Sequence, residues 1–187
     1  MGSKIAVEPT EHGITLAETK EYLKVEHDAD DITIRTLIEA AREHIEKLTW
    51  RALTPRTIML YLSAWDSRIL LPEPPLKEIT GINYIDVDGN IQTLASGDYL
   101  VDDTAVPAVL MPGYGKSWPA VRNVPNAIEI TYICGYETLP SSLKTAMLLL
   151  VAHWYEHRAA VEEGGNYAPL PIAVDALVDG YRVVRFQ

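Results

Sequence analysis

PSSLKTAMLLLVAHWYEHR, residues 140–158, predicts one long helix with apolar side chains on almost every face. Such a helix belongs in a protein interior, because it has no polar face to present to solvent. Pro140 suits the first turn, and Ser141 or Ser142 can accept hydrogen bonds from the free N–H groups there. The apolar run is far shorter than the roughly 20 residues that a bilayer requires. We therefore expect a buried central helix rather than a membrane span.

Two helices are expected ahead of this stretch. Thr15 and Glu18 have the spacing of a capping box, which predicts a short helix that ends near Val25. The acidic run at 28–31 favours the start of a longer second helix. Its apolar residues recur at helical spacing: Ile34, Leu37, Ile38, Ala41, Ile45 and Leu48. Its other face is charged and most simply solvated: Arg35, Glu39, Arg42, Glu43, Glu46 and Lys47.

The periodicity changes between residues 55 and 137. Short runs rich in β-branched and aromatic residues, interrupted by Gly and Pro, predict antiparallel strands. Asp88-Gly89 between the runs 79–87 and 91–94 predicts a tight hairpin, because both residues tolerate positive φ. The remaining predicted strands are 57–62, 68–71, 99–101, 106–111 and 128–134. A short helix over 172–178 and a tail strand or arm at 181–186 are expected at the end of the chain.

These elements predict an α+β fold in a single domain, residues 1–187. We expect mainly a helical bundle, built from N-terminal helices, the long central buried helix and a short C-terminal helix. The helical part is expected over 14–54 and 138–182. An antiparallel β region is expected as an insertion over 55–137.

The composition is that of a folded protein. Hydrophobic residues make up 48% and charged residues 22%, which argues against disorder. The net charge of −10 argues against a protein whose main task is to grip nucleic-acid phosphates. Cys134 is the single cysteine, so an internal disulfide is excluded and a reducing compartment is expected. The N-terminal residues lack the pattern of a signal peptide.

One motif suggests an enzyme. His153, Glu156 and His157 match H-x-x-E-H, the inverted zinc-protease signature, and histidines four residues apart share a helix face. A zinc-dependent hydrolase also needs a third ligand. The nearby carboxylates lie in or beyond a Gly-rich break: Glu162, Glu163, Asp175 and Asp179. The same residues are also expected where a buried helix reaches solvent, with Trp154 and Tyr155 packed and the polar side chains exposed. We therefore predict no catalytic residue, no metal and no cofactor.

A series of short stretches follows in a distinctive order along the chain. The first half contributes LAE-x-x-EYL at 16–23, AARE at 40–43, T-x-RAL at 49–53 and LP-x-PPL at 71–76. The second half contributes Y-x-D-x-DG at 84–89, WP at 118–119, I-x-I-x-Y-x-x-GY at 128–136, P-x-x-LK-x-A at 140–146, HWYE-x-R at 153–158 and L-x-x-x-YR at 177–182. In this order and spacing, from Ile14 to Arg182, the chain resembles the head–tail connector proteins of long-tailed bacteriophages and prophages.

The resemblance implies a structural virion protein and not an enzyme. It implies a ring of about twelve copies under the portal protein, which extends the DNA channel. The ring would offer a platform for the next neck or tail-completion protein and let DNA pass without specific binding. The implied location is the virion neck, after assembly in the host cytoplasm, with no membrane partner. The zinc-dependent hydrolase and another tail-completion or virion assembly protein remain as alternatives.

A ring requires one face of each subunit to fit a different face of its neighbour. Two surfaces are candidates for contacts with a neighbour or with the portal. They are the charged helix face of Arg42, Glu43, Glu46 and Lys47, and the C-terminal arm with Tyr181, Arg182 and Phe186. Both assignments are hypotheses. The first requires complementary charge on the neighbour, and the second requires an arm that adds to a partner's surface.

Overall fold

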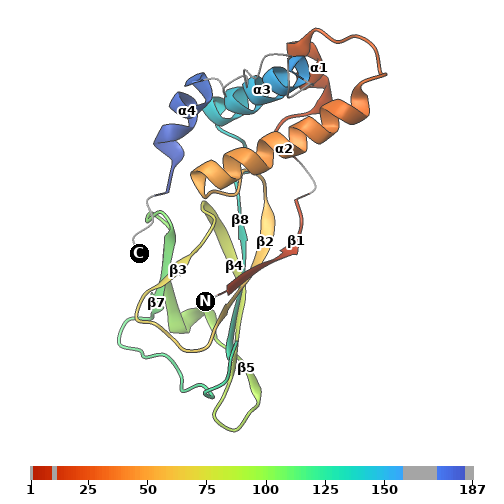
Figure 1. Ribbon diagram of the computed structural model, residues 1–187. Helices are drawn as coiled ribbons and strands as arrows, with labels where there is room; N and C mark the ends of the chain where they lie inside the picture. Colours follow the sequence, from red (N-terminus) through yellow and green to blue (C-terminus); the bar gives the residue numbers. More distant parts are fainter. Residues whose placement is uncertain (1, 10–11, 158–171, 184–187) are drawn as a thin grey trace, which may run out of the picture. The chain divides into compact units, whose positions relative to one another are not determined.

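The computed structural model describes residues 2–9, 12–157 and 172–183. The chain divides into two compact units. Unit 1 comprises Met1–Pro9 and Thr54–Tyr136, and unit 2 comprises Thr10–Leu53 and Glu137–Gln187. In Figure 1 the α-helices and most of the strands carry labels. None of the described helices combines the length and the apolar character that a membrane crossing needs. The expectation of one domain over residues 1–187 stays a prediction.

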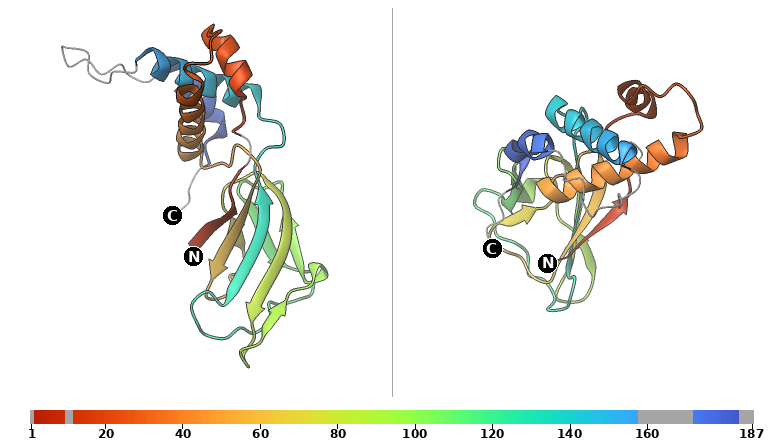
Figure 2. Two further views of the ribbon diagram at one scale, coloured as in Figure 1. Left: turned by 90° about the vertical axis from the view of Figure 1, so that its right-hand side faces the viewer. Right: turned by 45° about the horizontal axis from the view of Figure 1, so that its top comes forward.

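Unit 1 consists mainly of two antiparallel sheets (Figures 1 and 2). The large sheet has the order β1-β2-β8-β4-β5, with β1 Gly2–Val7, β2 Arg56–Leu62, β8 Ile128–Cys134, β4 Leu76–Ile85 and β5 Ile91–Thr93. The small sheet has the order β3-β7-β6, with β3 Ile69–Leu71, β7 Ala108–Pro112 and β6 Tyr99–Asp102. A 3-10 turn, η1 Ser96–Asp98, lies immediately before β6.

Buried and partly exposed residues alternate along the strands of unit 1, and the buried ones form its core. Every second residue of β2 from Arg56 to Leu60, and every second residue of β8, is buried. The small sheet contributes Ile69, Leu71 and Leu110, each at most 3% exposed. Residues that alternate in this way point to opposite faces of a strand, so each sheet has one buried face. These two faces supply the hydrophobic core of unit 1.

Unit 2 is helical and contains α1 Leu16–Leu23, α2 Asp31–Thr49, α3 Ser141–Glu156 and α4 Ile172–Val178, followed by the 3-10 turn η2 Asp179–Tyr181. The predicted central helix is present as α3, and it packs along α2. Its buried residues are Leu143, Ala146, Met147, Leu150 and Val151. Those of α2 include four from the predicted stripe: Ile34, Ile38, Ala41 and Ile45.

The predicted capping box at the start of α1 is confirmed. The Thr15 hydroxyl accepts the Glu18 N–H at 3.2 Å, and the Glu18 carboxylate accepts the Thr15 N–H at 3.0 Å. The predicted hairpin is also confirmed, because β4 pairs with β5 and Gly89 has a φ of +96°. Both features depend on residues close in sequence, which local spacing identifies well.

The prediction of a mainly helical bundle is wrong. Eight strands in two antiparallel sheets are present in the described residues, so unit 1 is a β structure with its own core. The N-terminal strand β1 was also missed. It pairs with β2, some fifty residues further along the chain by sequence, through contacts such as Lys4 with Met59. Its residues are mostly exposed, so it lacks the apolar alternation that predicts a half-buried strand.

Candidate interaction surfaces

The charged face of α2 separates into inward and outward side chains. Arg42 is buried, with 6% of its side chain exposed, and donates from Nη1 to Glu46 Oε2 at 2.8 Å. Glu46 Oε1 accepts the backbone N–H of Leu53 at 2.9 Å. Glu43 is 64% exposed on its side chain, and Lys47 is also exposed. Arg42 and Glu46 are therefore directed into unit 2, whereas Glu43, 3.7 Å from Arg42 at its carboxylate, and Lys47 face solvent.

This placement changes how Arg42 can be tested. An Arg42→Glu substitution would put a second carboxylate beside Glu46 in a buried position. Loss of assembly in that variant would report on folding rather than on a contact between subunits. Glu43 and Lys47 are the suitable positions, because substitutions at exposed sites leave the fold intact.

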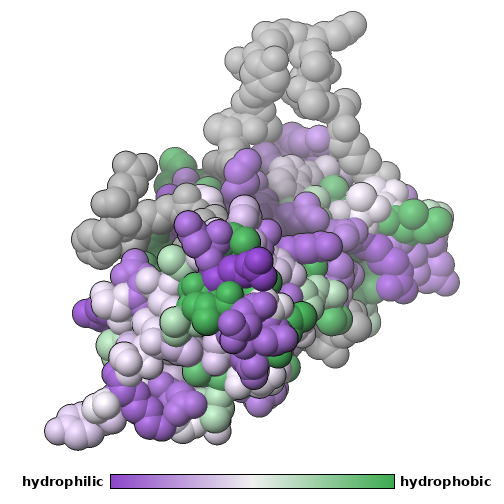
Figure 3. Space-filling view, turned by 90° about the horizontal axis from the view of Figure 1, so that it is seen from below, coloured by the Kyte–Doolittle hydropathy of each residue, from purple (hydrophilic) through white to green (hydrophobic). Residues whose placement is uncertain are grey.

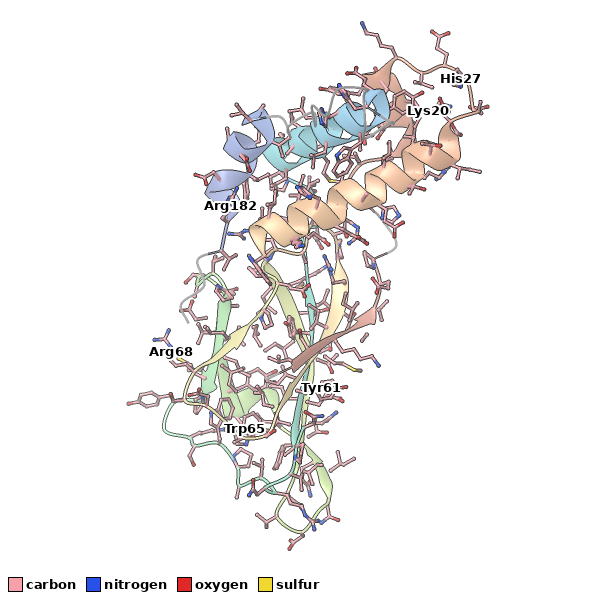
Figure 4. The ribbon with its side chains drawn as sticks, in the orientation of Figure 1. Lys20, His27, Tyr61, Trp65, Arg68 and Arg182 are labelled. Atoms are coloured by element: carbon pink, nitrogen blue, oxygen red, sulfur yellow. The ribbon has the colours of Figure 1, made fainter. Side chains whose placement is uncertain are left out.

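The C-terminal arm is attached to the end of α2. Arg51 Nε donates to the Tyr181 carbonyl at 2.6 Å, and the Val183 N–H donates to the Thr49 carbonyl at 3.0 Å. Arg182, labelled in Figure 4, forms ion pairs with Asp175 at 2.9 Å and with Asp179 at 3.6 Å. Tyr181 and Arg182 thus have contacts within unit 2. The predicted interface residue Phe186 lies outside the described residues.

Sequence reasoning missed Trp50, which lies between the two residues that hold the arm. Trp50 ends α2 in the left-handed conformation, with φ 58°, and is 44% exposed. Glycine is the usual residue at this position of a helix, because a side chain makes positive φ costly. The sequence has no glycine where the apolar stripe of α2 ends, and this absence could have indicated that another residue, here Trp50, adopts the positive φ. Trp50 is a further candidate contact residue.

Two residues between the two histidines of H-x-x-E-H pack α3 within unit 2, whereas Glu156 and His157 are exposed. The intervening Trp154 meets the ring of His44 edge-on, with centroids 5.9 Å apart, and the Tyr155 hydroxyl donates to Asp30. The rings of His153 and His157 lie 4.7 Å apart. Among the residues that the structure describes, no group of three or more His, Cys, Asp and Glu side chains is placed to hold a metal ion.

Unit 1 contains an aromatic cluster that holds a long loop in place. Trp65 stacks on Trp118 with a centroid separation of 4.5 Å and meets Tyr84 edge-on at 6.2 Å. Trp118 Nε1 donates to the Asp66 carbonyl at 2.7 Å. These contacts attach the loop that follows β7 to the connection between β2 and β3, near the label of Trp65 in Figure 4. The aromatic cluster therefore has a structural role, which is to fix this loop against the β2–β3 connection.

Comparison with known proteins identifies the family. The family model described as HCP, head completion protein, matches residues 13–167. No curated protein matches the chain.

Three solved structures share the fold. The first is from the neck of an empty GTA particle computed with C6 symmetry, at 24% identity and a TM-score of 0.80. The second is from the virion of the native gene transfer agent (GTA) particle, at 24% identity and 0.81. The third is from the neck of the native GTA particle computed with C12 symmetry, at 26% identity and 0.76. Each alignment covers 100% of this chain and 98% of the other.

The family match spans most of the sequence, including the helices of unit 2 as far as α3 and the strands β2 to β8 of unit 1. The resemblance to head–tail connectors that the sequence indicated is confirmed. This chain belongs to the head completion protein family.

Proposed function

We propose that this structural head–tail connector of the virion neck acts as one subunit of a closed ring of about twelve copies. The observation that carries the proposal is the fold shared over the whole chain with a protein of a neck computed with C12 symmetry. A related neck was computed with C6 symmetry. A twelve-fold ring contains six-fold symmetry, so twelve copies are compatible with both descriptions.

The ring lies under the portal protein and extends the DNA channel toward the next neck or tail-completion protein. The charge of the chain supports this position. A net charge of −10 opposes capture of DNA phosphates, so DNA can pass through a ring of such subunits without specific binding. No membrane partner, metal, cofactor or catalytic step belongs to this role.

Two surfaces of unit 2 are proposed to contact partners. Glu43 and Lys47 are exposed on α2 and can pair with complementary charges on a neighbouring subunit. The C-terminal arm begins at Tyr181 and Arg182, which unit 2 holds in place, and is proposed to contact a neighbour or the portal together with Phe186. Contacts that fix the start of an arm lower the entropy that binding must overcome.

Native mass spectrometry of the purified chain, after removal of loosely bound metal, tests the proposal. We expect a closed ring of about twelve copies, assembled alone or on added portal protein, and no retained zinc. A Lys47→Glu variant should weaken the ring, and a Lys47→Glu/Glu43→Lys variant should weaken it further, because both side chains would then face like charges on the neighbour. Lys24→Glu at the exposed end of α1 is the matched control. A monomer that fails to bind the portal, or one tightly held zinc ion per chain, would contradict the proposed function.

A further inference from the structure

On the face that Figure 3 draws, hydrophobic areas are small and lie among hydrophilic ones. Single exposed apolar side chains of this kind are ordinary on protein surfaces and do not indicate a partner. The attachment of helix α1 in unit 2 is more distinctive, because charged side chains hold this helix in place.

Little of α1 is buried. Thr19 is the only buried residue of this helix, all of which the structure describes, and Leu16 and Leu23 are partly exposed. Helices α2 and α3, which pack along each other, have six and five buried residues. A helix as short as the eight residues of α1 is marginal by itself, so α1 depends on its attachment to α2 and α3.

The Lys20 ammonium attaches α1 to the start of α2. Lys20 Nζ lies 2.6 Å from Asp28 Oδ1 and 2.8 Å from Asp31 Oδ1. Only 15% of the Lys20 side chain is exposed, although it carries a charge. The two carboxylates, Asp28 first, raise the pKa of Lys20. Figure 4 labels Lys20, and Figures 1 and 2 show the connection 24–30 as an open loop, so one cation joins α1 both to this loop and to α2.

A second ion pair attaches α1 to α3. The Lys144 ammonium donates to the Glu18 carboxylate, and the two side chains are 37% and 43% exposed. Residues 18–31 contain two lysines, Lys20 and Lys24, and an excess of carboxylates: Glu18, Glu21, Glu26, Asp28, Asp30 and Asp31. Like charges repel, so Lys20 and Lys144 offset this repulsion as well as forming ion pairs.

The ends of α1 are capped by residues of its own segment. The capping box of Thr15 and Glu18 satisfies the first turn. At the last turn the Val25 N–H donates to the Lys20 carbonyl at 3.0 Å. Helix α1 is therefore one cooperative element whose own hydrogen bonds do not require α2 or α3.

We propose that α1 is an ionic latch that detaches from α2 and α3 while these two helices stay packed. Lys20 and Lys144 hold the latch closed, and Ile14, 5% exposed, keeps the chain before it attached. The buried residues of α2 and α3 maintain their contact when α1 leaves. Opening uncovers the surfaces of α2 and α3 that α1 contacts. The inference concerns motion within one chain and does not depend on the proposed ring.

Native-state hydrogen exchange of the full chain tests the latch, with mass spectrometry at increasing urea concentrations below the unfolding transition. The amides of residues 19–25 should exchange at least about tenfold faster than the most protected amides of α2 and α3. Their exchange should change little with urea, because a local opening exposes little surface. If these amides exchange at the rate and with the urea dependence of α2 and α3, α1 opens only on global unfolding and the proposal is overturned.

Charge variants separate the ionic attachment from packing. Lys20→Met keeps an apolar stem and removes the charge, so it should speed the exchange of residues 19–25 about fivefold. Lys144→Met should speed it about two- to fivefold, since its ion pair is more exposed. Lys24→Met is the matched control, because Lys24 is an exposed lysine at the end of the same helix, and it should leave the rate unchanged. Equal effects of Lys20→Met and Lys24→Met, or no effect of Lys20→Met, would overturn the latch.

Added salt gives a second readout. In a Lys20→Met/Lys144→Met variant the charges around α1 are mainly carboxylates, so about 0.5 M NaCl should screen their repulsion and slow the exchange of residues 19–25 about twofold or more. The variant should still show a cooperative urea transition, because α2 and α3 keep their buried residues. Exchange that salt leaves unchanged or accelerates in this variant would contradict an ionic attachment.

Discussion

Glu46 accepts the backbone N–H of Leu53 at 2.9 Å, from a position seven residues earlier in the chain. Its other carboxylate oxygen accepts from the buried Arg42 at 2.8 Å. One side chain therefore pairs with a buried cation and also accepts a hydrogen bond from a backbone group beyond the end of α2. A residue that appeared to belong to a solvated charged face is a structural element of unit 2.

Glu46→Ala should lower the free energy of unfolding by about 3 kcal/mol, because it leaves the Arg42 guanidinium buried with less compensation and removes the acceptor of Leu53. Urea denaturation measures the change. Glu43→Ala is the matched control, since Glu43 also lies near Arg42 but is 64% exposed, and its effect should stay below about 0.5 kcal/mol. Equal effects of the two substitutions would refute the assignment.

Gly135→Ala should destabilise the protein by about 3 kcal/mol or more, or prevent folding. Gly135 has a φ of +109°, and an added Cβ would lie 2.2 Å from the Thr54 carbonyl oxygen. Gly81→Ala in β4 is the control, because no atom lies within 4 Å of its added Cβ. That change should be neutral or stabilise by up to about 1 kcal/mol. Thermal unfolding compares the two, and a tolerated Gly135→Ala would contradict the geometry.

Glu18 should make stability depend on acid pH. The Lys144 ammonium, with help from the Thr15 N–H, lowers the pKa of Glu18 from 4.5 to about 2. A lowered pKa in the folded state stabilises above the ordinary value, and this contribution disappears as pH falls from 4.5 to about 2. Both side chains are more than a third exposed, so the effect should be about 1 kcal/mol at most.

Glu18→Gln isolates this charge, because glutamine can keep the capping box. The stability difference between wild type and Glu18→Gln should be present at pH 6 and vanish near pH 2. In a Lys144→Met background the same substitution should have little effect at either pH. A difference that does not change with pH would show that the ion pair contributes nothing.

Tyr132→Phe should cost about 1–2 kcal/mol. The Tyr132 ring is fully buried, and its hydroxyl donates to the Pro72 carbonyl at 2.9 Å. Burial raises the pKa of this phenol, so stability should fall as pH rises above the ordinary value of 10.0, and this fall should be smaller in the variant. Chemical denaturation at pH 7 and pH 11 measures both effects. Tyr114→Phe, at an exposed position, should change neither.

The sequence was sufficient where neighbours in sequence are also neighbours in space. The capping box of Thr15 and Glu18 and the hairpin at Asp88-Gly89 depend on a few adjacent residues, and both were predicted. The apolar stripe of α2 and the unbroken apolar run of α3 identified a buried helix pair, because helical spacing determines which side chains share a face.

Candidate contact residues were harder to assign from sequence. The sequence does not distinguish Arg42 and Glu46 from Glu43 and Lys47. Only the packing of α2 shows that the first two point inward and the other two are exposed. The exposed apolar residues Leu70 and Leu100 come from separate strands. Leu70 and Leu100 share a face only because β7 lies between β3 and β6.

The sequence by itself determined the family, the helices of unit 2, most strands of unit 1 and the acidic charge, because order, spacing and periodicity are local or additive properties. Tertiary structure decided that the β region forms two sheets with a core of its own, that β1 joins the large sheet, and which charged residues are buried. These outcomes depend on strand pairing and packing between residues far apart in the chain, and periodicity within a segment carries no information about its partner.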